Sequence, residues 1–258
     1  MVPAYRKYLK NQELPGMAET ETDQMKGLPL PSIQKPYSKD AELVDLVNPE
    51  QFSLGNMPLI EAIKNRRSRR NFTQESLTLE ELSFLLWVTQ GVEKLIHNGL
   101  VTIRTVPSGG AMHPFETYLL INRVNGISPG LYRYLALNHK LLKLCSEGAD
   151  LTSRINEASN GQNFIGESAV VFIWTVRPYR TEYRYGEDSL KDILISVGHI
   201  CQNLYLACES IGAGTCAIVA YNQKLLDSFI GVDGEDEIAL YLAPVGRVKQ
   251  SELNFRQC

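Results

Sequence analysis

SLKDILISVGHICQNLYLACESIG, at residues 189–212, is the longest helical pattern in the sequence. Gly212 is predicted to end this helix, because glycine readily adopts the backbone conformation of a C-terminal cap. Cys201 and Cys208 lie seven positions apart, so they share one side of the helix and are expected to pack as small core residues. The apolar positions cover more than one side, which predicts a largely buried helix: Ile193, Ile195, Val197, Ile200, Leu204 and Leu206.

Strand patterns lie on both sides of this helix in the sequence. Residues 169–176, AVVFIWTV, form a β-branched and aromatic run that predicts a fully buried strand. Residues 116–121 predict another strand, residues 131–144 a hairpin turning at Asn138–His139, and residues 238–245 the last strand. Because helices and hairpins interleave, the sequence predicts an α+β fold with a mixed, mainly antiparallel sheet flanked by helices.

Two shorter helical patterns precede the strands. Pro58 opens the first, at residues 59–67, because proline is favoured in the first turn of a helix. Thr78 opens the second, with Glu81 three residues later as in a capping box, and Gly91 closes it. The apolar residues of the first helix are expected to face the core: Leu59, Ile60 and Ile63.

The N-terminal residues have a different composition. Residues 1–58 contain several prolines and few apolar runs. We expect an extended arm that wraps a partner subunit or stays mobile, rather than a separate domain. The chain is thereby divided into an arm, 1–58, and one folded domain, 59–258.

The overall composition is that of an ordinary globular protein. Of 258 residues, 44% are hydrophobic and 21% charged, and the formal net charge is −3. This balance gives no general attraction to nucleic acid or anionic lipid. The longest strongly apolar run, residues 169–176, is too short to span a bilayer, and the first residues lack the apolar segment of a secretion signal. We therefore expect a cytoplasmic protein that binds neither membranes nor nucleic acid.

The cysteines and histidines form no recognisable metal or catalytic motif. The five cysteines contain no CxxC pair, which favours reduced thiols in a cytosolic protein. The four histidines show neither HExxH nor a cluster with cysteine. We expect no metal site, and the sequence assigns no catalytic side chain.

Four arginines crowd one short segment, where Arg66, Arg67, Arg69 and Arg70 surround Ser68. One interpretation is a solvated basic patch at a helix C-terminus, where cations are mildly favoured. The other is a phosphate clamp, because the planar guanidinium can hold two phosphate oxygens and a serine hydroxyl adds a donor. The spacing alone leaves both interpretations open.

Small residues gather at three further places. Pro107, Ser108, Gly109 and Gly110 form a loop whose backbone a planar ligand could approach closely, although glycine runs are also common in ordinary loops. Residues 212–216 form another small stretch after the long helix. Two residues follow the last strand and offer a cation far from the first cluster in sequence: Gly246 and Arg247.

The order of these features along residues 50–248 is distinctive. The motifs are RRSRRNF, LTLEELSFLLW, PSGGAMHPFETY, GLYRY, VGHICQNLYLACESIGAG and APVGR. They resemble the nitroreductase superfamily, and most of all its SagB-type dehydrogenases, which include azoline oxidases of thiazole and oxazole peptide pathways. An ordered set of motifs is more specific than a lone glycine motif. The resemblance implies a nitroreductase-like fold, a homodimer built around the long helix, and two FMN sites that each use both subunits.

The resemblance also implies roles for particular residues. Residues of the arginine segment hold the FMN phosphate and ribityl chain and approach the pyrimidine edge: Arg66, Ser68 and Arg70, assisted by Arg67. A loop of the partner subunit covers the flavin: Pro107, Ser108, Gly109 and Gly110. The C-terminal phosphate-binding cation is Arg247, after Gly246. Val219 and Ala220 bring backbone near flavin N5 and O4, where many relatives carry Glu-Gly instead. His199, Gln202 and Asn203 are expected to satisfy buried hydrogen bonds.

The implied activity is an FMN-dependent oxidoreduction. Electrons pass from NAD(P)H to a small conjugated acceptor, a nitroaromatic or a quinone, by a ping-pong mechanism. An alternative is a flavin-dependent dehydrogenase or azoline oxidase acting on a peptide. That branch is associated with a Lys-Tyr pair before the long helix, and the counterpart here is Arg184-Tyr185. A further alternative is a non-enzymatic flavin- or nucleic-acid-binding protein, although the arginines have no interleaved aromatic residues for stacking on RNA.

Overall fold

The computed structural model describes residues 21–146 and 150–249. Its centre is a seven-stranded sheet in which the strands pair antiparallel throughout. The predicted α+β class with a mainly antiparallel sheet is thus confirmed. The spatial order is β1 (Leu43–Asp45), β6 (Lys140–Ser146), β5 (Gly130–Leu135), β4 (Phe115–Ile121), β7 (Val170–Val176), β9 (Ile238–Arg247) and β8 (Ala213–Thr215).

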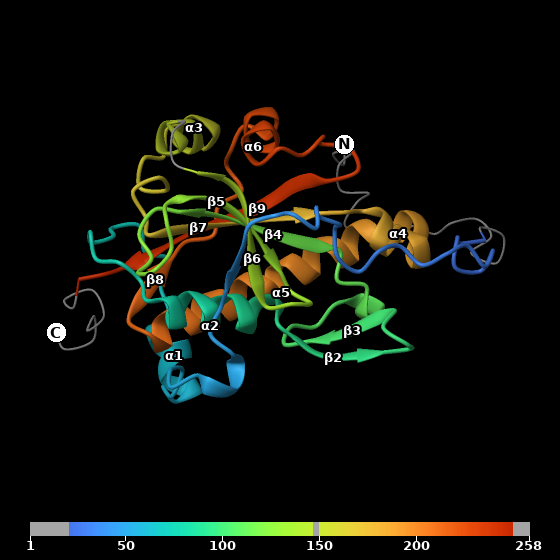
Figure 1. Cartoon of the computed structure of the whole chain (residues 1–258), viewed down its shortest axis with the longest axis horizontal. Coiled ribbons are helices and arrows are strands. Elements are labelled where there is room, and N and C mark those ends of the chain that lie inside the picture. Colours follow the sequence, from blue (N-terminus) through green and yellow to red (C-terminus); the bar gives the residue numbers. More distant parts are fainter. Residues whose placement is uncertain (1–20, 147–149, 250–258) are drawn as a thin grey trace, which may run out of the picture.

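Helices cover both faces of this sheet (Figure 1). One face carries α1 (Leu59–Asn65), α2 (Leu79–Gln90) and α5 (Ser189–Ser210), and the other carries α3 (Leu151–Ala158) and α6 (Gln223–Ile230). The remaining helix, α4 (Tyr179–Tyr185), packs near the start of α5, and β2 (Val92–Ile96) with β3 (Val101–Arg104) forms a separate hairpin. The 3-10 turns are η2 (Pro49–Gln51), η3 (Gly109–Ala111) and η4 (Gly186–Asp188).

Strand β7 shows why the run at residues 169–176 is apolar throughout. Successive side chains of a strand point to opposite faces of the sheet. Phe172 and Trp174 enter the core beneath α2 and α5, whereas Val171 and Ile173 enter the core beneath α3 and α6. Since both faces are covered by helices, every residue of β7 is buried, as predicted.

The local signals for helix and turn positions are confirmed. Thr78 accepts from the Glu81 amide at 3.1 Å, and Glu81 accepts from the Thr78 amide at 2.8 Å, which completes the capping box of α2. The hairpin of β5 and β6 turns at Asn138 and His139. Cys201 and Cys208 are buried in the core, as expected from their spacing.

The prediction of a largely buried α5 is wrong for one side of the helix. Ile193, Val197 and Ile200 lie against the sheet, but Leu194 and Ile195 are each 50% exposed. The helix therefore has a second apolar side with no partner among the residues that the structure describes.

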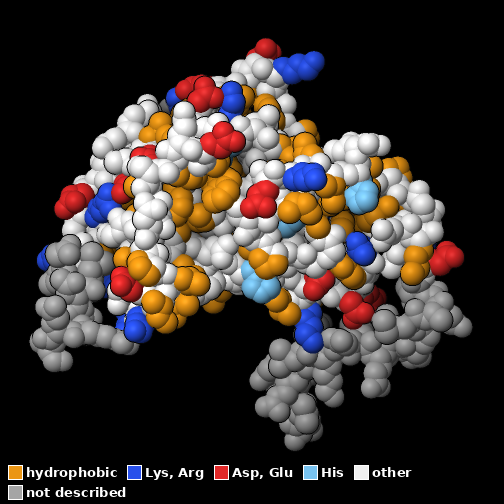
Figure 2. All heavy atoms as spheres, turned by 90° about the horizontal axis from the view of Figure 1, so that it is seen from below, with side chains coloured by type: hydrophobic (Ala, Val, Ile, Leu, Met, Phe, Trp, Pro, Cys, Tyr) orange, Lys and Arg blue, Asp and Glu red, His pale blue; other side chains and the backbone are white. Residues whose placement is uncertain are grey.

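The orientation predicted for α1 is wrong. Leu59, Ile60 and Ile63 are 64%, 57% and 52% exposed, and Ala62 is the buried residue of this helix. Like the outer side of α5, these side chains form an unpartnered apolar surface in the described part of the chain. Figure 2 shows hydrophobic side chains gathered in patches on this side of the molecule.

Residues 21–58 of the predicted arm pack against their own chain. Strand β1 extends the sheet beside β6, the Lys35 ammonium lies 2.7 Å from the Glu237 carboxylate, and Arg180 Nε donates to the Ser32 carbonyl at 2.7 Å. The expectation that this segment wraps a partner subunit stays a prediction. Residues 1–20 lie outside the described residues, and the boundary at residue 58 stays a prediction.

None of the helices among the described residues combines the length and apolarity needed to cross a membrane. Nor do residues 21–146 and 150–249 bring three or more histidine, cysteine, aspartate or glutamate side chains together as metal ligands.

Candidate functional site

The arginine segment is an extended strip along the edge of the sheet. Ser68 forms a parallel bridge with Thr215 of β8, and the Arg69 amide donates to the Thr215 carbonyl at 2.9 Å. Because side chains of extended backbone alternate in direction, Arg69 points inward while Ser68 and Arg70 face solvent. Arg67 is also exposed, and Arg66 is half-buried at the end of α1.

Arg69 differs from the other arginines in being part of the core. It is 5% exposed, and its Nη2 lies 3.0 Å from Glu209 Oε1, with a further hydrogen bond from Nε at 3.2 Å. Removal of either member would leave a buried charge without its counterion. Arg69 therefore anchors the segment to the C-terminal end of α5, so that its neighbours are held in place facing outward.

Tyr205 is a site residue that the sequence analysis missed. Its hydroxyl lies 2.9 Å from Ser68 Oγ and accepts from the Ala217 amide at 2.8 Å, and its ring lies 5.3 Å from the Arg66 guanidinium carbon. Its spacing in the sequence could have indicated it. Tyr205 lies four residues before Glu209, so it is one helical turn away from the residue that pairs with Arg69.

Arg247 lies close to the arginine segment, but its guanidinium already has partners within the chain. Its guanidinium pairs with Glu81 and donates to the Ile211 carbonyl at 2.6 Å. Glu81 is the same residue that caps α2. Gly246 lies under the Phe72 ring, where a Cβ would come within 2.9 Å of ring carbons. A phosphate at this place would meet a cation whose charge is already shared with a carboxylate.

The loop after the long helix lies at the same edge. Thr215 pairs with Val245 of β9 and bridges to Ser68, and Ala217 bonds to Tyr205. Val219 is 72% exposed, and Ala220 beside it is also exposed. Two of the sequence-predicted groups, residues 66–70 and 246–247, thus lie beside β8. Residues 219–220 follow the segment 215–217 in the chain, and the Ala220 carbonyl accepts from Gln162 Nε2 at 2.9 Å.

The fourth group, the loop Pro107–Gly110, lies elsewhere. A Cβ at Gly109 would lie 2.2 Å from an Asp192 carboxylate oxygen, and one at Gly110, whose φ is +56°, would lie 2.6 Å from the Tyr185 hydroxyl. Ser108 Oγ accepts from the His113 amide at 3.1 Å, which closes the loop. These contacts seat the loop against the N-terminal end of α5, and the close approach explains its glycines.

The loop and the arginine segment therefore sit at opposite ends of one helix. The loop contacts Asp192, and the segment contacts Tyr205, thirteen residues further along α5. At 1.5 Å per residue this corresponds to about 20 Å along the helix axis. Within one chain the two groups do not form a common site.

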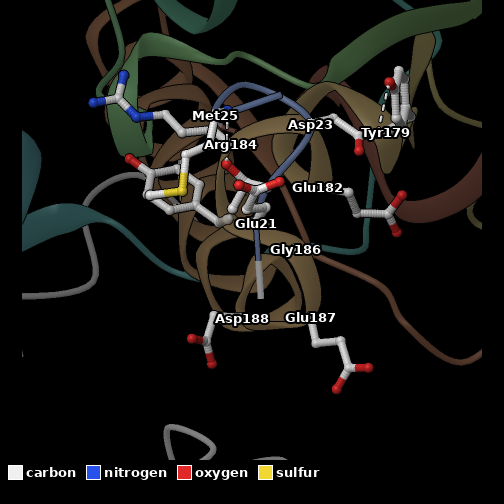
Figure 3. A pocket seen from close by; sticks show the side chains of 11 residues that line it. Glu21, Asp23, Met25, Tyr179, Glu182, Arg184, Gly186, Glu187 and Asp188 are labelled. Carbon is white, nitrogen blue, oxygen red and sulfur yellow. Dashed lines mark hydrogen bonds between the residues drawn. The ribbon is translucent and has the colours of Figure 1, made fainter. Parts of the chain in front are cut away.

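A cavity of about 480 Å³ lies between arm residues 21–25 and the end of α4 (Figure 3). Arg184 and Tyr185 line it and lie close to Gly110, whose carbonyl accepts from Arg184 Nη1 at 3.5 Å. Among the described residues that line it, Arg184 is the one basic residue and five are acidic: Glu21, Asp23, Glu182, Glu187 and Asp188. The surroundings of the cavity thus carry more acidic than basic groups, next to the predicted flavin-covering loop.

The polar residues of α5 divide into two groups. Asn203 donates to the Val88 carbonyl at 2.9 Å and to the Thr105 carbonyl at 3.4 Å, as expected for a structural role. His199 and Gln202 are exposed, so the expectation that they satisfy buried hydrogen bonds within the chain is wrong. Both lie on the outer side of α5, where the helix is also apolar.

His113, which follows the loop, is not suited to acid–base work. Burial, with a contribution from the nearby Arg104, lowers the pKa of His113 to about 3. The imidazole is therefore neutral at physiological pH and donates no proton to a ligand.

The chain is similar to known proteins of one family. The model of the nitroreductase family matches residues 63–247. A nitroreductase-family protein of Methanocaldococcus jannaschii is 32% identical over 197 residues, which cover 74% of this chain and 94% of the relative. Trifolitoxin-processing protein TfxB of Rhizobium leguminosarum is 28% identical over 148 residues, 53% of this chain and 38% of TfxB. A nitroreductase-family crystal structure from Ralstonia eutropha has a TM-score of 0.66 at 26% identity, covering 86% of this chain and 98% of that one. The chain belongs to the nitroreductase family.

Proposed function

We propose that this protein is an FMN-dependent oxidoreductase whose two sites form at the interface of a homodimer. The observation that carries the proposal is the arginine segment, residues 66–70, in which Arg67, Ser68 and Arg70 are exposed and Arg66 is half-buried. Among the described residues, no carboxylate lies within ion-pair distance of Arg66, Arg67 or Arg70. Two guanidinium groups around a serine hydroxyl suit a dianionic phosphate, because all three are donors and the cations are uncompensated.

In the proposed dimer, the partner subunit supplies the loop that covers the flavin. The outer side of α5 presents Leu194, Ile195, Gly198, His199 and Gln202 at helical spacing, and this surface needs a partner. In a twofold dimer the same surface meets itself, so two α5 helices packed antiparallel bring the loop end of one chain to the arginine end of the other. The Pro107–Gly110 loop would then cover the flavin held by the partner's arginine segment.

The chain's own residues bind and orient, and FMN when bound supplies the hydride chemistry. Arg66, Ser68 and Arg70 hold the phosphate and ribityl chain, with Arg67 assisting. An arginine at the pyrimidine edge stabilises the negative charge that accompanies flavin reduction. Val219 and Ala220 are exposed residues that follow the segment contacting Tyr205, and their backbone is proposed to approach the flavin.

We infer that electrons enter from NAD(P)H and leave to a small conjugated acceptor by a ping-pong mechanism. The cavity beside Gly110 has room for such an organic molecule. Its acidic residues disfavour anionic acceptors, so we expect the acceptor to be neutral or cationic. Cytoplasmic location and the absence of a nucleic-acid partner remain predictions.

A second candidate is the oxidation of a peptide. Two observations favour it: the similarity to TfxB, and the position of Arg184 and Tyr185 on the cavity wall against Gly110. The arginine stands where the azoline-oxidising branch has lysine, so the proton-transfer capacity of that position is reduced, since arginine stays protonated.

An anaerobic assay distinguishes the two functions. We expect the purified protein to be yellow and its flavin to be bleached by NADH or NADPH, then reoxidised by a nitroaromatic or quinone. Bleaching by a synthetic azoline peptide but not by either nicotinamide would instead support the second candidate. A protein that is colourless as purified, and that retains no flavin after incubation with FMN and removal of the excess, would rule out both functions.

The dimer site is tested by Ile195→Glu. Burying a carboxylate in the proposed interface is expected to raise the dimer dissociation constant about tenfold or more, because each interface contains the charge twice. Sedimentation at several concentrations measures the shift, and the monomer should lose bound flavin while keeping its circular dichroism spectrum. Leu225→Glu, at an exposed leucine of α6 on the opposite face, is the control. A monomeric wild type saturated with FMN would contradict the proposal.

A further inference from the structure

Tyr205 joins the two segments that flank the proposed phosphate site. Its hydroxyl contacts Ser68 of the arginine strip at 2.9 Å and the Ala217 amide of the 215–220 loop at 2.8 Å. Its ring lies beneath the half-buried Arg66 guanidinium at 5.3 Å. The Tyr205 side chain therefore contacts three groups: the Arg66 guanidinium, the Ser68 hydroxyl and the Ala217 amide.

The direction of the hydrogen bonds follows from the donors present. The Ala217 N–H can only donate, so the Tyr205 oxygen accepts from it. Burial raises the pKa of Tyr205 above its ordinary value, so the phenol keeps its proton. Either hydroxyl can donate in the pair that Tyr205 forms with Ser68, but Ser68 Oγ is the acceptor within hydrogen-bond distance of the phenol among the described residues. The arrangement that pairs the phenol proton therefore has the phenol donating to Ser68 Oγ. The Ser68 proton is then free to point outward, and Ser68 is exposed on that side.

We propose that Tyr205 is a positioning residue that fixes the Ser68 hydroxyl as a donor toward the phosphate of the bound flavin. The inference rests on the proposed FMN site. A phosphate only accepts hydrogen bonds at neutral pH, so a serine whose proton is turned inward would present it with a lone pair. The chain from Ala217 through Tyr205 to Ser68 disfavours that orientation, because it would leave the phenol proton unpaired, and each bond in such a chain strengthens the next.

Tyr205→Phe tests the inference, because it keeps the ring under Arg66 and removes the hydroxyl. The full-length chain is reconstituted with FMN or with riboflavin, which lacks the phosphate, and affinities are measured by flavin fluorescence. We expect FMN affinity to fall about three- to tenfold, the loss typical of one hydrogen bond, with riboflavin affinity unchanged. Ser68→Ala should give the same pattern, and the double variant should be no weaker than the weaker single variant.

Tyr221→Phe is the matched control, since the Tyr221 hydroxyl donates to the Ala239 carbonyl and is not part of this chain of bonds. A general structural role would lower the affinities for FMN and riboflavin alike, and additive losses in the double variant would show that Tyr205 and Ser68 act separately. Either result overturns the inference, as does wild-type FMN affinity in Tyr205→Phe. If the wild-type protein binds no FMN, the proposed function fails as well.

Discussion

Arg69→Ala is expected to lower the free energy of unfolding by about 3–5 kcal/mol, because it leaves the Glu209 carboxylate buried without its cation. Arg69 and Glu209 are 5% and 3% exposed, so water cannot replace the lost partner. Denaturation by urea, followed by tryptophan fluorescence at fixed protein concentration, measures the change.

Arg70→Ala is the matched control for this stability loss. It removes an exposed arginine of the same segment and should change stability by less than about 0.5 kcal/mol. Arg69→Met combined with Glu209→Leu should recover much of the loss, since both charges are then absent. Equal stability of Arg69→Ala and Arg70→Ala would mean that the buried pair does not anchor the segment.

Arg66→Ala is expected to weaken FMN binding roughly ten- to a hundredfold while the fold stays intact. A charge-assisted contact to phosphate typically contributes about 1.5–3 kcal/mol, which corresponds to that range of affinity. Arg66 ends a short helix whose apolar residues face solvent or a partner, so its removal does not open the core. Titration of the flavin-free protein by fluorescence quenching gives the affinity.

Lys64→Ala is the control for Arg66→Ala. Lys64 is an exposed cation two residues earlier, in the last turn of the same helix, so its removal changes the local charge equally. Arg69 is unsuitable for this purpose, because its loss is expected to unfold the segment. Unchanged FMN affinity in both variants would mean that the arginine segment is a solvated basic patch and not a phosphate site.

The fold could be predicted where the signal is local. The capping box at Thr78 and Glu81 depends on residues three positions apart, and the burial of β7 follows from an uninterrupted apolar run. The exposure of the apolar residues of α1 and of the outer side of α5 could not be predicted. An apolar side chain gives the same pattern whether it faces its own core or another surface.

The arrangement of the candidate site could also be predicted only in part from local sequence patterns. Spacing alone could not tell which arginine turns inward, because that depends on the extended backbone of the segment and on its pairing with β8. Tyr205 contacts Ser68 across 137 positions of sequence, so no local pattern marks their association. The resemblance to relatives assigned no flavin contact to Arg69, and the structure supplies the reason in its pairing with Glu209.

The separation of the loop and the arginine segment along α5 has a genetic consequence. On the proposed arrangement each site draws one half from each chain. A copy damaged in the arginine segment and a copy damaged in the loop are both inactive alone. When they pair, one of the two sites receives both damaged halves, while the other receives both intact ones. Two defective alleles of this kind complement each other, so selection acts on the pair of chains rather than on each chain by itself.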